Sequence, residues 1–462
     1  MFYIILFDIL NSVIIKYVME VNVSKLQTKE KLEKSQILEL YRNGCKPADT
    51  FKVGLEYERL PISTVTNKAV DYGADFGVCN FLRAFAKEEN FDYITDDYNI
   101  IGLKQNHDTI TLEPGSQVEL SVEPETSIDG IKRKVDYLNS KMAPILDRYN
   151  IKLLEYGVSP LSTHKTINLI PKKRYHIMAK YLWGILSDVM MRETAGIQAC
   201  FDFKDEQDAM RKFLIANKMT PFMTAMFANS PIRGGVETGY KTFRALSWLN
   251  TDNDRCGFCG KMDEDFSFEK YVDCVMKSPI IFINREGLPV DIKGKINFED
   301  FIENGWEGFE AGIDDYKLHA NLYFPEVRMR NFIEIRNHDC GNSGMAYAVL
   351  AIYKGILYNE SAMNEIEELL APFSYRDLAE LRYNVPKSAL AAHIKGFTAA
   401  DIAKEILYIA EKALIEGGTG EEKYLEPIKQ YTLDGLTPAD VILRNWNGAW
   451  NKDINKLIKY LA

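Results

Sequence analysis

The chain has 462 residues, a hydrophobic content of 46% and a formal net charge of −10. The length allows a large core and more than one domain, and the composition is that of a soluble globular protein. The acidic balance argues against a general binder of nucleic acid or of anionic membranes, because such a protein presents a basic surface.

The N-terminal segment does not resemble the rest of the chain. Residues 1–17 are mostly apolar but are interrupted by Asp8 and Lys16. They are too short and too interrupted for a membrane span, and they lack a small-residue cleavage site. We expect residues 1–22 to be a non-native or disordered extension, with the true start at Met19, and we expect the protein to be cytoplasmic.

The first half of the chain alternates between helical and strand patterns. Helical spacing is found over residues 23–43, 74–90 and 128–149, and strand signals over 51–59, 110–122 and 153–157. In the first strand Glu56 and Glu58 share the polar face, about 6–7 Å apart at the rise of a strand. A lone Glu-x-Glu is most often a solvated outer face, so this pair alone does not establish a site.

The acidic pattern returns on two later segments. The strands of residues 110–122 flank the turn Glu113-Pro114-Gly115, and Glu119 follows the turn. Further along, Glu334 and Arg336 alternate with apolar residues. Crowded carboxylates resist ionising unless cations lie among them, and hard oxygen ligands suit Mg²⁺, which usually accompanies phosphates. Five carboxylates could share two or three Mg²⁺ or Mn²⁺ ions: Glu56, Glu58, Glu113, Glu119 and Glu334.

The second half begins with a basic segment. Residues 172–192 predict one helix with Met178, Tyr181, Leu182 and Ile185 in the core, and residues 194–203 predict a strand whose polar face carries Gln198. A helix over 206–230 precedes a Gly-rich loop, residues 234–239, which we interpret as a lid or a connection.

The last hundred residues are helical, with start signals at Thr398 and Thr437. We predict one interleaved α+β domain over residues 23–462. Its helices lie on the far side of a mainly antiparallel sheet, and its C-terminal part, from about 360 to 462, is helical.

The cysteine and glycine patterns do not identify a disulfide framework, a metal site or a nucleotide-binding loop. The seven cysteines are odd in number and scattered, which argues against a disulfide framework. Cys256 and Cys259 form the one C-x-x-C pair, and a zinc site would need a second pair nearby. We interpret them as ordinary thiols, with a redox or metal role as the alternative. No GxxxxGK[ST] or GxGxxG motif occurs, so a bound nucleotide would not be held by a P-loop or a Rossmann turn.

Five ordered motifs resemble glutamate–cysteine ligases of the plant and proteobacterial type. They are residues 53–59 (VGLEYER), 111–121 (TLEPGSQVELS), 191–202 (MRETAGIQACFD), Ser230-Pro231 with Arg244 and residues 251–255 (TDNDR), and 324–336 (FPEVR…IEIR). The resemblance covers residues 30–460. It implies a fold similar to glutamine synthetase, with a curved, mainly antiparallel sheet and helices on its convex side.

The resemblance also implies the chemistry. ATP would phosphorylate the γ-carboxylate of L-glutamate, and the amine of L-cysteine would displace phosphate to give γ-glutamylcysteine, the first step of glutathione biosynthesis. By motif position, the five carboxylates would be metal ligands. Arg336 would hold the transferring phosphoryl group and Arg244 the α-carboxylate of glutamate. Substrate or nucleotide contacts would come from Gln198, Arg255 and Arg328, with Asp252 and Asp254 as weaker candidates whose alternative is an ordinary turn.

The chain departs from the family's motif at one point, which bears on the pocket for the amine acceptor. After the late Glu-x-Arg the family has Gly-Ala-Asp, whereas this chain has Asn337-His338-Asp339-Cys340. We expect these residues to border the acceptor pocket, although a packed histidine is the alternative for His338.

Two other functions stay open at this point. One is a carboxylate–amine ligase that joins glutamate to another amine. The other is a non-catalytic metal- or nucleotide-binding protein on the same fold, against which the retained acidic strands and arginines argue. We expect a monomer or a homodimer that binds neither nucleic acid nor membranes.

Overall fold

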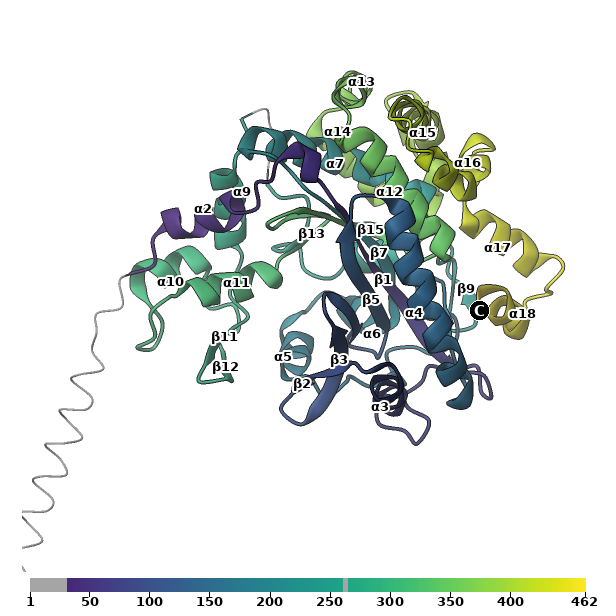
Figure 1. Ribbon diagram of the computed structural model, residues 1–462, viewed down its shortest axis with the longest axis horizontal. Helices are drawn as coiled ribbons and strands as arrows, with labels where there is room; N and C mark the ends of the chain where they lie inside the picture. The colour runs from purple at the N-terminus through teal and green to yellow at the C-terminus, as the bar shows by residue number, and fades with distance from the viewer. Residues whose placement is uncertain (1–30, 261–264) are drawn as a thin grey trace, which may run out of the picture.

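The computed structural model describes residues 31–260 and 265–462 (Figure 1). The expected N-terminal extension therefore lies outside the described residues. The expected helix over residues 23–43 is described only from residue 31 onward, where α2 spans Lys34–Arg42.

A nine-stranded sheet forms the centre of the molecule. Its order is β14-β15-β7-β1-β5-β4-β3-β2, with β6 paired to the end of β1, and all neighbouring strands are antiparallel. The prediction of an α+β fold on a mainly antiparallel sheet is confirmed. The strands are β1 (Val53–Ser63), β2 (Asp92–Asp96), β3 (Asn99–Gln105), β4 (Asp108–Leu112), β5 (Val118–Glu125), β6 (Ile151–Leu154), β7 (Gly196–Phe201), β14 (Val327–Met329) and β15 (Ile333–Asp339).

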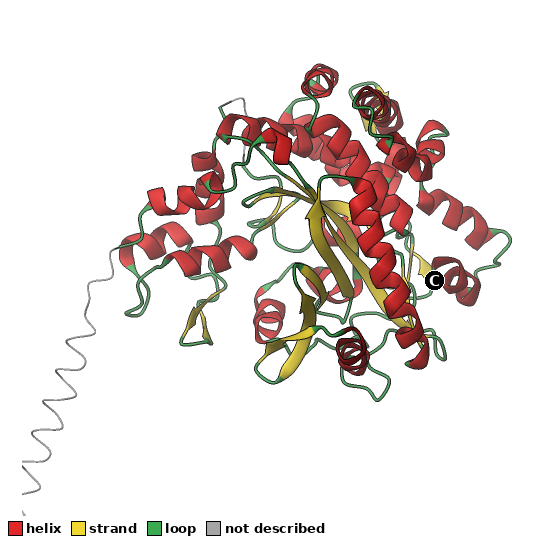
Figure 2. Cartoon of the chain, viewed as in Figure 1, coloured by secondary structure: helices red, strands yellow, loops and turns green. Residues whose placement is uncertain are grey.

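Long helices cover one face of this sheet, as Figure 2 shows in red against yellow. The apolar residues of β1 and β7 that alternate with polar ones, such as Leu55, Tyr57 and Ala199, are buried on this face. The covering helices are α3 (Val78–Glu89), α4 (Ile128–Arg148), α7 (Glu206–Met226) and α12 (Ser343–Leu357).

The C-terminal helices pack outside that layer, with α15 against α12 and α13. The predicted start signals at Thr398 and Thr437 are the N-caps of α15 and α17, where each threonine forms a capping box with Asp401 or Asp440. The helices are α13 (Glu360–Leu370), α14 (Tyr375–Ser388), α15 (Ala399–Glu416), α16 (Glu426–Leu433), α17 (Pro438–Asn447) and α18 (Ile454–Leu461).

A smaller helical lobe lies at the left of Figure 1. It contains α2, α9 (Phe268–Lys277), α10 (Phe298–Asn304), α11 (Ile313–Asn321) and the hairpin of β11 (Phe282–Arg285) and β12 (Leu288–Asp291). The remaining short elements are α5 (Lys173–Tyr181), α6 (Ser187–Glu193), α8 (Phe243–Leu249), β8 (Ile232–Arg233), β9 (Val236–Glu237), β10 (Cys256–Gly257), β13 (Phe324–Pro325), β16 (His393–Ile394), β17 (Phe397–Thr398) and the 3₁₀ turns Ala48–Thr50, Ala389–Ala391 and Glu421–Leu425.

One local prediction is wrong. The single helix over 172–192 is broken into α5 and α6, because the N–H groups of Gly184 and Leu186 donate to the carbonyls of Thr251 and Asn250 instead of continuing a helix. Ile185, expected in the core, is 86% exposed as a result. The Gly-rich loop over residues 234–239, interpreted as a lid or a connection, contains the second strand of a short hairpin of β8 and β9, which leaves that interpretation open.

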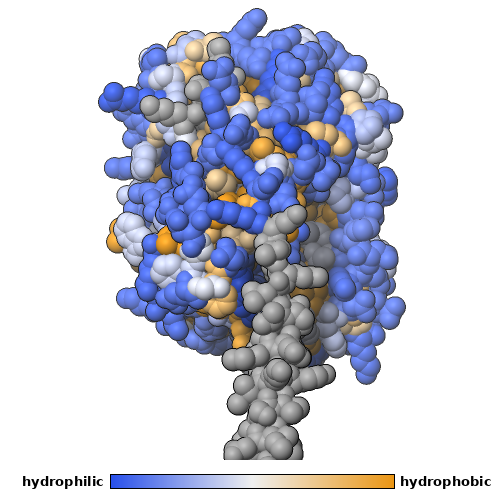
Figure 3. Space-filling model, turned by 90° about the vertical axis from the view of Figure 1, so that its left-hand side faces the viewer, coloured by the Kyte–Doolittle hydropathy of each residue, from blue (hydrophilic) through white to orange (hydrophobic). Residues whose placement is uncertain are grey.

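On the face shown in Figure 3, hydrophilic residues predominate and hydrophobic ones form scattered patches. Within the described ranges, no helix combines the length and the apolar character that crossing a membrane requires.

Candidate active site

A cavity of about 230 Å³ lies on the sheet face opposite the long helices. Its floor consists of the strands β1, β5, β7 and β15. Its walls consist of α5, α6, α8 and the β13 segment. The lining residues are Glu56, Glu58, Glu113, Pro114, Gln117, Glu119, Arg174, Tyr175, Met178, Met190, Met191, Thr194, Gln198, Arg244, Trp248, Asn321, Phe324, Arg328, Arg330 and Arg336.

Carboxylates occupy one half of this cavity, which we call the acidic half: Glu56, Glu58, Glu113 and Glu119. Glu56 and Glu58 project from β1 into the cavity because Tyr57 between them faces the helices. The strand register places Glu58 directly opposite Glu119 of β5, where two like charges destabilise a strand pair. The prediction that these side chains share one surface agrees with their positions.

The crowding changes the protonation of the acidic half. Burial raises the pKa of Glu119 well above its usual range, and the neighbouring carboxylates raise it further. Burial and the charge of Glu113 raise the pKa of Glu58. Burial and the charge of Glu334 raise the pKa of Glu56 to about 7, despite nearby guanidinium groups. The protein therefore supplies too little positive charge for these carboxylates, and a cation would relieve the deficit.

The other half of the cavity, the arginine half, is lined by Arg328, Arg330 and Arg336, and these side chains surround Glu334, which is fully buried and does not itself line the cavity. Both carboxylate oxygens of Glu334 accept hydrogen bonds from these three guanidinium groups. Burial alone would raise the pKa of Glu334, but the arginines hold it well below its usual range. This carboxylate is thus already neutralised by the protein.

Gln198 of β7 connects the two halves. Its Nε2 donates to Oε1 of Glu58 at 2.9 Å, and its Oε1 accepts from Arg336. The backbone N–H of Gly196 donates to the other oxygen of Glu58 at 2.6 Å. These bonds hold the Glu58 carboxylate in one orientation beside Arg336.

Arg244 is held at the cavity by a network that begins at Asp339. The Asp339 carboxylate accepts hydrogen bonds from the Ser230 and Thr242 hydroxyl groups, and Thr242 caps α8, which carries Arg244. The Arg244 guanidinium lies over Gly196, where an added Cβ would come within 2.4 Å of its Nη2 atom. Glycine at 196 therefore makes room for the guanidinium.

One predicted binding residue lies elsewhere. Arg255 is buried outside this cavity, where its Nε donates to Asp252 at 2.6 Å and its other nitrogens donate to Leu322, Pro279 and Tyr181. The structure thus gives Arg255 and Asp252 a role in holding the segment before β10, and it does not bring them together with the carboxylates.

Residues 337–340, where the chain departs from the family motif, do not face one common site. The reason is that the pairing of β15 with β7 has an irregular register between Ile335 and His338. His338 is buried among Phe227 and Tyr353 on the helical side, as a packed imidazole. Cys340 is buried as well, and only Asn337 borders a cavity next to Arg336. All seven cysteines are free thiols.

Several lining residues were not predicted. Arg330 ion-pairs with Glu334, and its two-residue spacing from Arg328 was the available signal. Arg174 and Tyr175 come from the basic segment that starts α5, to which we assigned no role. Trp248 and Phe324 carry no signal of their own in the sequence.

The donor set of the acidic half is suited to hard divalent cations, since all its ligand atoms are carboxylate oxygens. As the side chains stand, no group of three Asp, Glu, His or Cys residues within the described ranges encloses a metal position.

The chain is similar to proteins of one family. A model of the glutamate–cysteine ligase family 2 matches residues 52–459. A rice (Oryza sativa subsp. japonica) protein named chloroplastic glutamate–cysteine ligase B is 30% identical over 442 residues, which are 94% of this chain and 88% of that protein. The chloroplastic glutamate–cysteine ligase of Medicago truncatula is 30% identical over 438 residues, covering 94% of this chain and 85% of that protein.

Solved structures share the fold at low sequence identity. A glutamate–cysteine ligase from Francisella tularensis, crystallised with AMP, superposes with a TM-score of 0.54 at 14% identity over 88% of each chain. A bifunctional glutathione synthetase from Pasteurella multocida gives a TM-score of 0.50 at 12% identity, over 90% of this chain and 51% of that one.

Proposed function

The chain belongs to the glutamate–cysteine ligase family 2, and we propose that it joins the γ-carboxylate of L-glutamate to the amine of L-cysteine at the expense of ATP. The product is γ-glutamylcysteine, and the reaction is the first step of glutathione biosynthesis. The supporting observation is the cavity that combines an acidic half with an arginine half on one sheet face.

This combination suits the activation of a carboxylate by ATP. A carboxylate does not acylate an amine in water until phosphorylation supplies a leaving group. The attacking carboxylate and the triphosphate repel each other, so the site must supply positive charge where they meet. The arginine half and cations in the acidic half can supply it together.

Mg²⁺, as two or three ions, would be held by Glu56, Glu58, Glu113 and Glu119. The raised pKa values of Glu56, Glu58 and Glu119 reflect missing positive charge. When bound, the ions would offset the negative charge on the transferring phosphoryl group. Glu334 is the fifth candidate ligand, but its oxygens already accept from arginines, so it would have to give up one of these bonds.

The arginines take separate roles in this proposal. Arg336 lies between Glu334 and Gln198 and would stabilise the phosphoryl group as it transfers. Arg244 would bind the glutamate α-carboxylate, which suits its planar guanidinium. Arg328 is largely committed to Glu334, Asn321 and Tyr323, so we assign it to positioning Glu334.

A phosphate-release assay with ATP, Mg²⁺, glutamate and a panel of amines tests the function. We expect L-cysteine to give the highest kcat/KM. L-2-aminobutyrate should follow within about 10–200-fold, because a thiol and a methyl group differ by only about 1–3 kcal/mol in such a pocket. Putrescine should be inactive. A preference for putrescine, or no glutamate-dependent release with cysteine, would assign the chain to another carboxylate–amine ligation.

Three sequence predictions remain part of the proposal: a single catalytic domain over residues 23–462, a monomer or homodimer, and a cytoplasmic location. The rice and Medicago relatives are described as chloroplastic, so location is to be checked by imaging the tagged full-length protein.

A further inference from the structure

A second cavity, of about 210 Å³, lies on the side of the sheet that the long helices cover. It is found where α12, α16, α17 and α18 meet the ends of β6 and β15, and we call it the tyrosine cavity because Tyr431 and Tyr460 line it. None of the described residues lines both this cavity and the active-site cavity. Tyr460 is 50% exposed and Asn342 at the rim is exposed as well, so the tyrosine cavity opens to solvent and a ligand can enter it.

The charged groups of the tyrosine cavity are carboxylates. Glu155 and Asp339 line it, and within the described ranges no lining residue has a cationic side chain. The Asp339 carboxylate already accepts hydrogen bonds from the hydroxyl groups of Ser230 and Thr242 and from the backbone N–H of Asn229. The Asn229 side chain donates to the Glu155 carbonyl, so both acidic residues border the same part of the cavity. Glu155 is therefore the carboxylate that an occupant can engage.

Glu155 is short of hydrogen-bond donors. Its Oε1 accepts from the Tyr57 hydroxyl at 3.0 Å, but this hydroxyl is also 2.7 Å from the carbonyl oxygen of Gly341 and has one proton to share. Burial raises the pKa of Glu155, although the charge of Arg59 and the Tyr57 hydroxyl favour the ionised form. A cation in the cavity would supply the donor and the charge that this carboxylate lacks.

The rest of the lining favours an organic ammonium ion over a metal ion. Phe227 and Met345 give the cavity apolar walls, and Tyr431 and Tyr460 add aromatic rings. The two tyrosines are hydrogen-bonded to each other, and Trp450 packs on the Tyr460 ring with 5.2 Å between the ring centroids, so this aromatic wall is fixed. A divalent metal ion prefers a shell of oxygen ligands, whereas aromatic rings attract alkylammonium ions.

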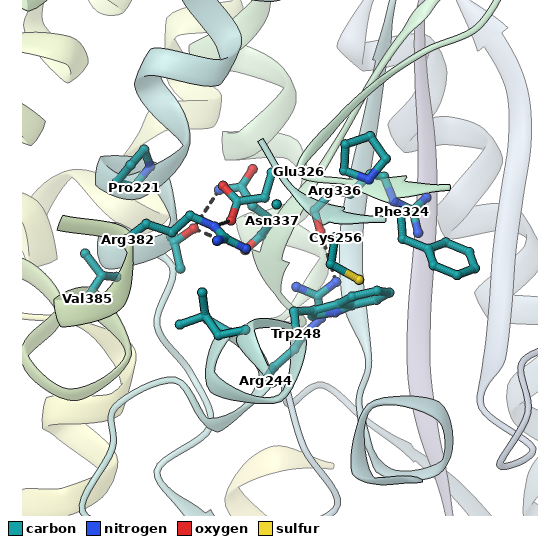
Figure 4. Close-up of a pocket in the computed structure, with 15 residues that line it drawn as sticks. Pro221, Arg244, Trp248, Cys256, Phe324, Glu326, Arg336, Asn337, Arg382 and Val385 are labelled. Carbon is teal, nitrogen blue, oxygen red and sulfur yellow. Dashed lines mark hydrogen bonds and ion pairs between the residues drawn. The ribbon is translucent and has the colours of Figure 1, made fainter. Parts of the chain in front are cut away.

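Asp339 connects the tyrosine cavity to the active site. The carboxylate that borders the cavity also holds Ser230 and Thr242, and Thr242 caps α8, which carries Arg244. Arg244 in turn donates to the backbone carbonyl of Arg336 (Figure 4). An ammonium ion beside Asp339 would attract this carboxylate and weaken its bonds to the start of α8.

We propose that the tyrosine cavity binds a small organic amine as its ammonium cation, with the charge at Glu155 and the alkyl chain against the aromatic wall. The occupant acts on Arg244 through Asp339 and thereby raises the glutamate KM. The statement about KM rests on the proposed ligase function, whereas the statement about binding does not.

Calorimetric titration with n-butylamine tests the binding site without turnover. Alkylamines, like the lysine side chain, are cations at neutral pH. We expect saturable binding with a Kd at or below about 1 mM. n-Butanol has the same chain length but no charge, so it should bind at least about tenfold more weakly.

Glu155→Gln removes the charge that the proposal requires. The amide oxygen can still accept from Tyr57, so the variant should fold, which a thermal melt checks. We expect it to bind n-butylamine at least about tenfold more weakly than the wild type. Glu405→Gln, on the exposed side of α15, is the matched control and should bind as the wild type does. Glu58→Gln should also bind normally, which distinguishes the tyrosine cavity from the acidic half.

Tyr460 provides variants that leave both carboxylates in place. Tyr460→Ala removes the ring and should weaken binding by about two- to fivefold, the usual effect of a cation–π contact at a partly exposed site. Tyr460→Phe keeps the ring and should bind n-butylamine as the wild type does.

Steady-state kinetics tests the connection to Arg244. At saturating n-butylamine, we expect the glutamate KM of the wild type to rise at least about fivefold, the lower end of typical coupling between two sites. The glutamate KM of Glu155→Gln should not respond to the same concentration of n-butylamine.

The outcomes separate the site, the connection and the ligase function. Absence of saturable binding, or equal binding by the wild type and Glu155→Gln, would overturn the ammonium site, and so would equal affinity for n-butylamine and n-butanol. Binding that depends on Glu155 but leaves the glutamate KM unchanged would disprove the connection to Arg244. If the wild type binds n-butylamine but releases no phosphate with glutamate and cysteine, the ligase function is wrong and the site stands.

Discussion

The two halves of the large cavity bury carboxylates in opposite electrostatic environments. In the acidic half, Glu58 and Glu119 face each other with raised pKa values and few cationic partners. In the arginine half, Glu334 has three guanidinium partners and a lowered pKa. The difference supports the proposal that the arginine half is complete as folded, whereas the acidic half would need bound cations to offset its charge.

The largest expected effect comes from the acidic half. Glu58→Gln removes a charged oxygen ligand, and we expect turnover to fall at least about 10³-fold, roughly 4 kcal/mol in activation free energy. Folding should be intact, because the substitution relieves repulsion. Glu405→Gln, on the exposed side of α15, is the control. Full activity of Glu58→Gln at ordinary Mg²⁺ concentration would remove Glu58 from the site.

The next prediction compares the two halves directly through stability. Glu334→Gln leaves three arginines without their shared carboxylate and should lower the free energy of unfolding by about 3–5 kcal/mol. Glu119→Gln should instead raise it in metal-free protein, because it removes one of several crowded carboxylates. Denaturant titrations in EDTA measure both changes. If the two substitutions shift stability in the same direction, the contrast between the halves is incorrect.

Arg336→Lys tests the catalytic role of the arginine half. Lysine retains the charge but loses the planar pair of donors, so we expect kcat to fall about 10²-fold with little change in the glutamate KM. Steady-state kinetics with varied glutamate distinguishes this from simple substrate binding. A rise in KM with kcat preserved would reassign Arg336 to holding the ground-state substrate.

The smallest effect is a pH dependence of the metal-free protein. The pKa of Glu56 is raised to about 7 in the folded state, above its unfolded value. Its contribution to stability is therefore greatest at low pH and is lost as the pH rises toward and through 7. We expect the free energy of unfolding to fall by about 2 kcal/mol between pH 5.5 and pH 8 relative to Glu56→Gln. Thermal melts in EDTA across this range measure it, and saturating Mg²⁺ should remove the difference. A parallel pH profile for wild type and variant would contradict it.

Strand periodicity was enough to place Glu56, Glu58 and Glu119 on one face, because alternation fixes the side from which each residue projects. The partners of these residues depend on which strands become neighbours, which one sequence does not encode locally. Arg330 enters the site because β14 pairs with β15, and Arg244 because Asp339 fixes the start of α8. Glu155, Asp339 and Tyr460 come from three separate segments, so the tyrosine cavity that they line left no pattern in the sequence. The break at Gly184 likewise results from bonds to residues about 65 positions later in the chain.

The order of the strands has a consequence for how the chain acquires its active site. β1 pairs with β7, and β7 pairs with β15, so the floor of the cavity joins segments that are synthesised early, midway and late. Pairings between such distant segments form slowly, because a long loop must close before the contacts stabilise it. The carboxylates of Glu56 and Glu58 on β1 are therefore enclosed only after most of the chain, including Arg336, has been synthesised. A nascent chain interrupted before β15 would lack both its neighbour for β7 and the arginines of the site, and it would present an unpaired strand edge that favours association with other chains.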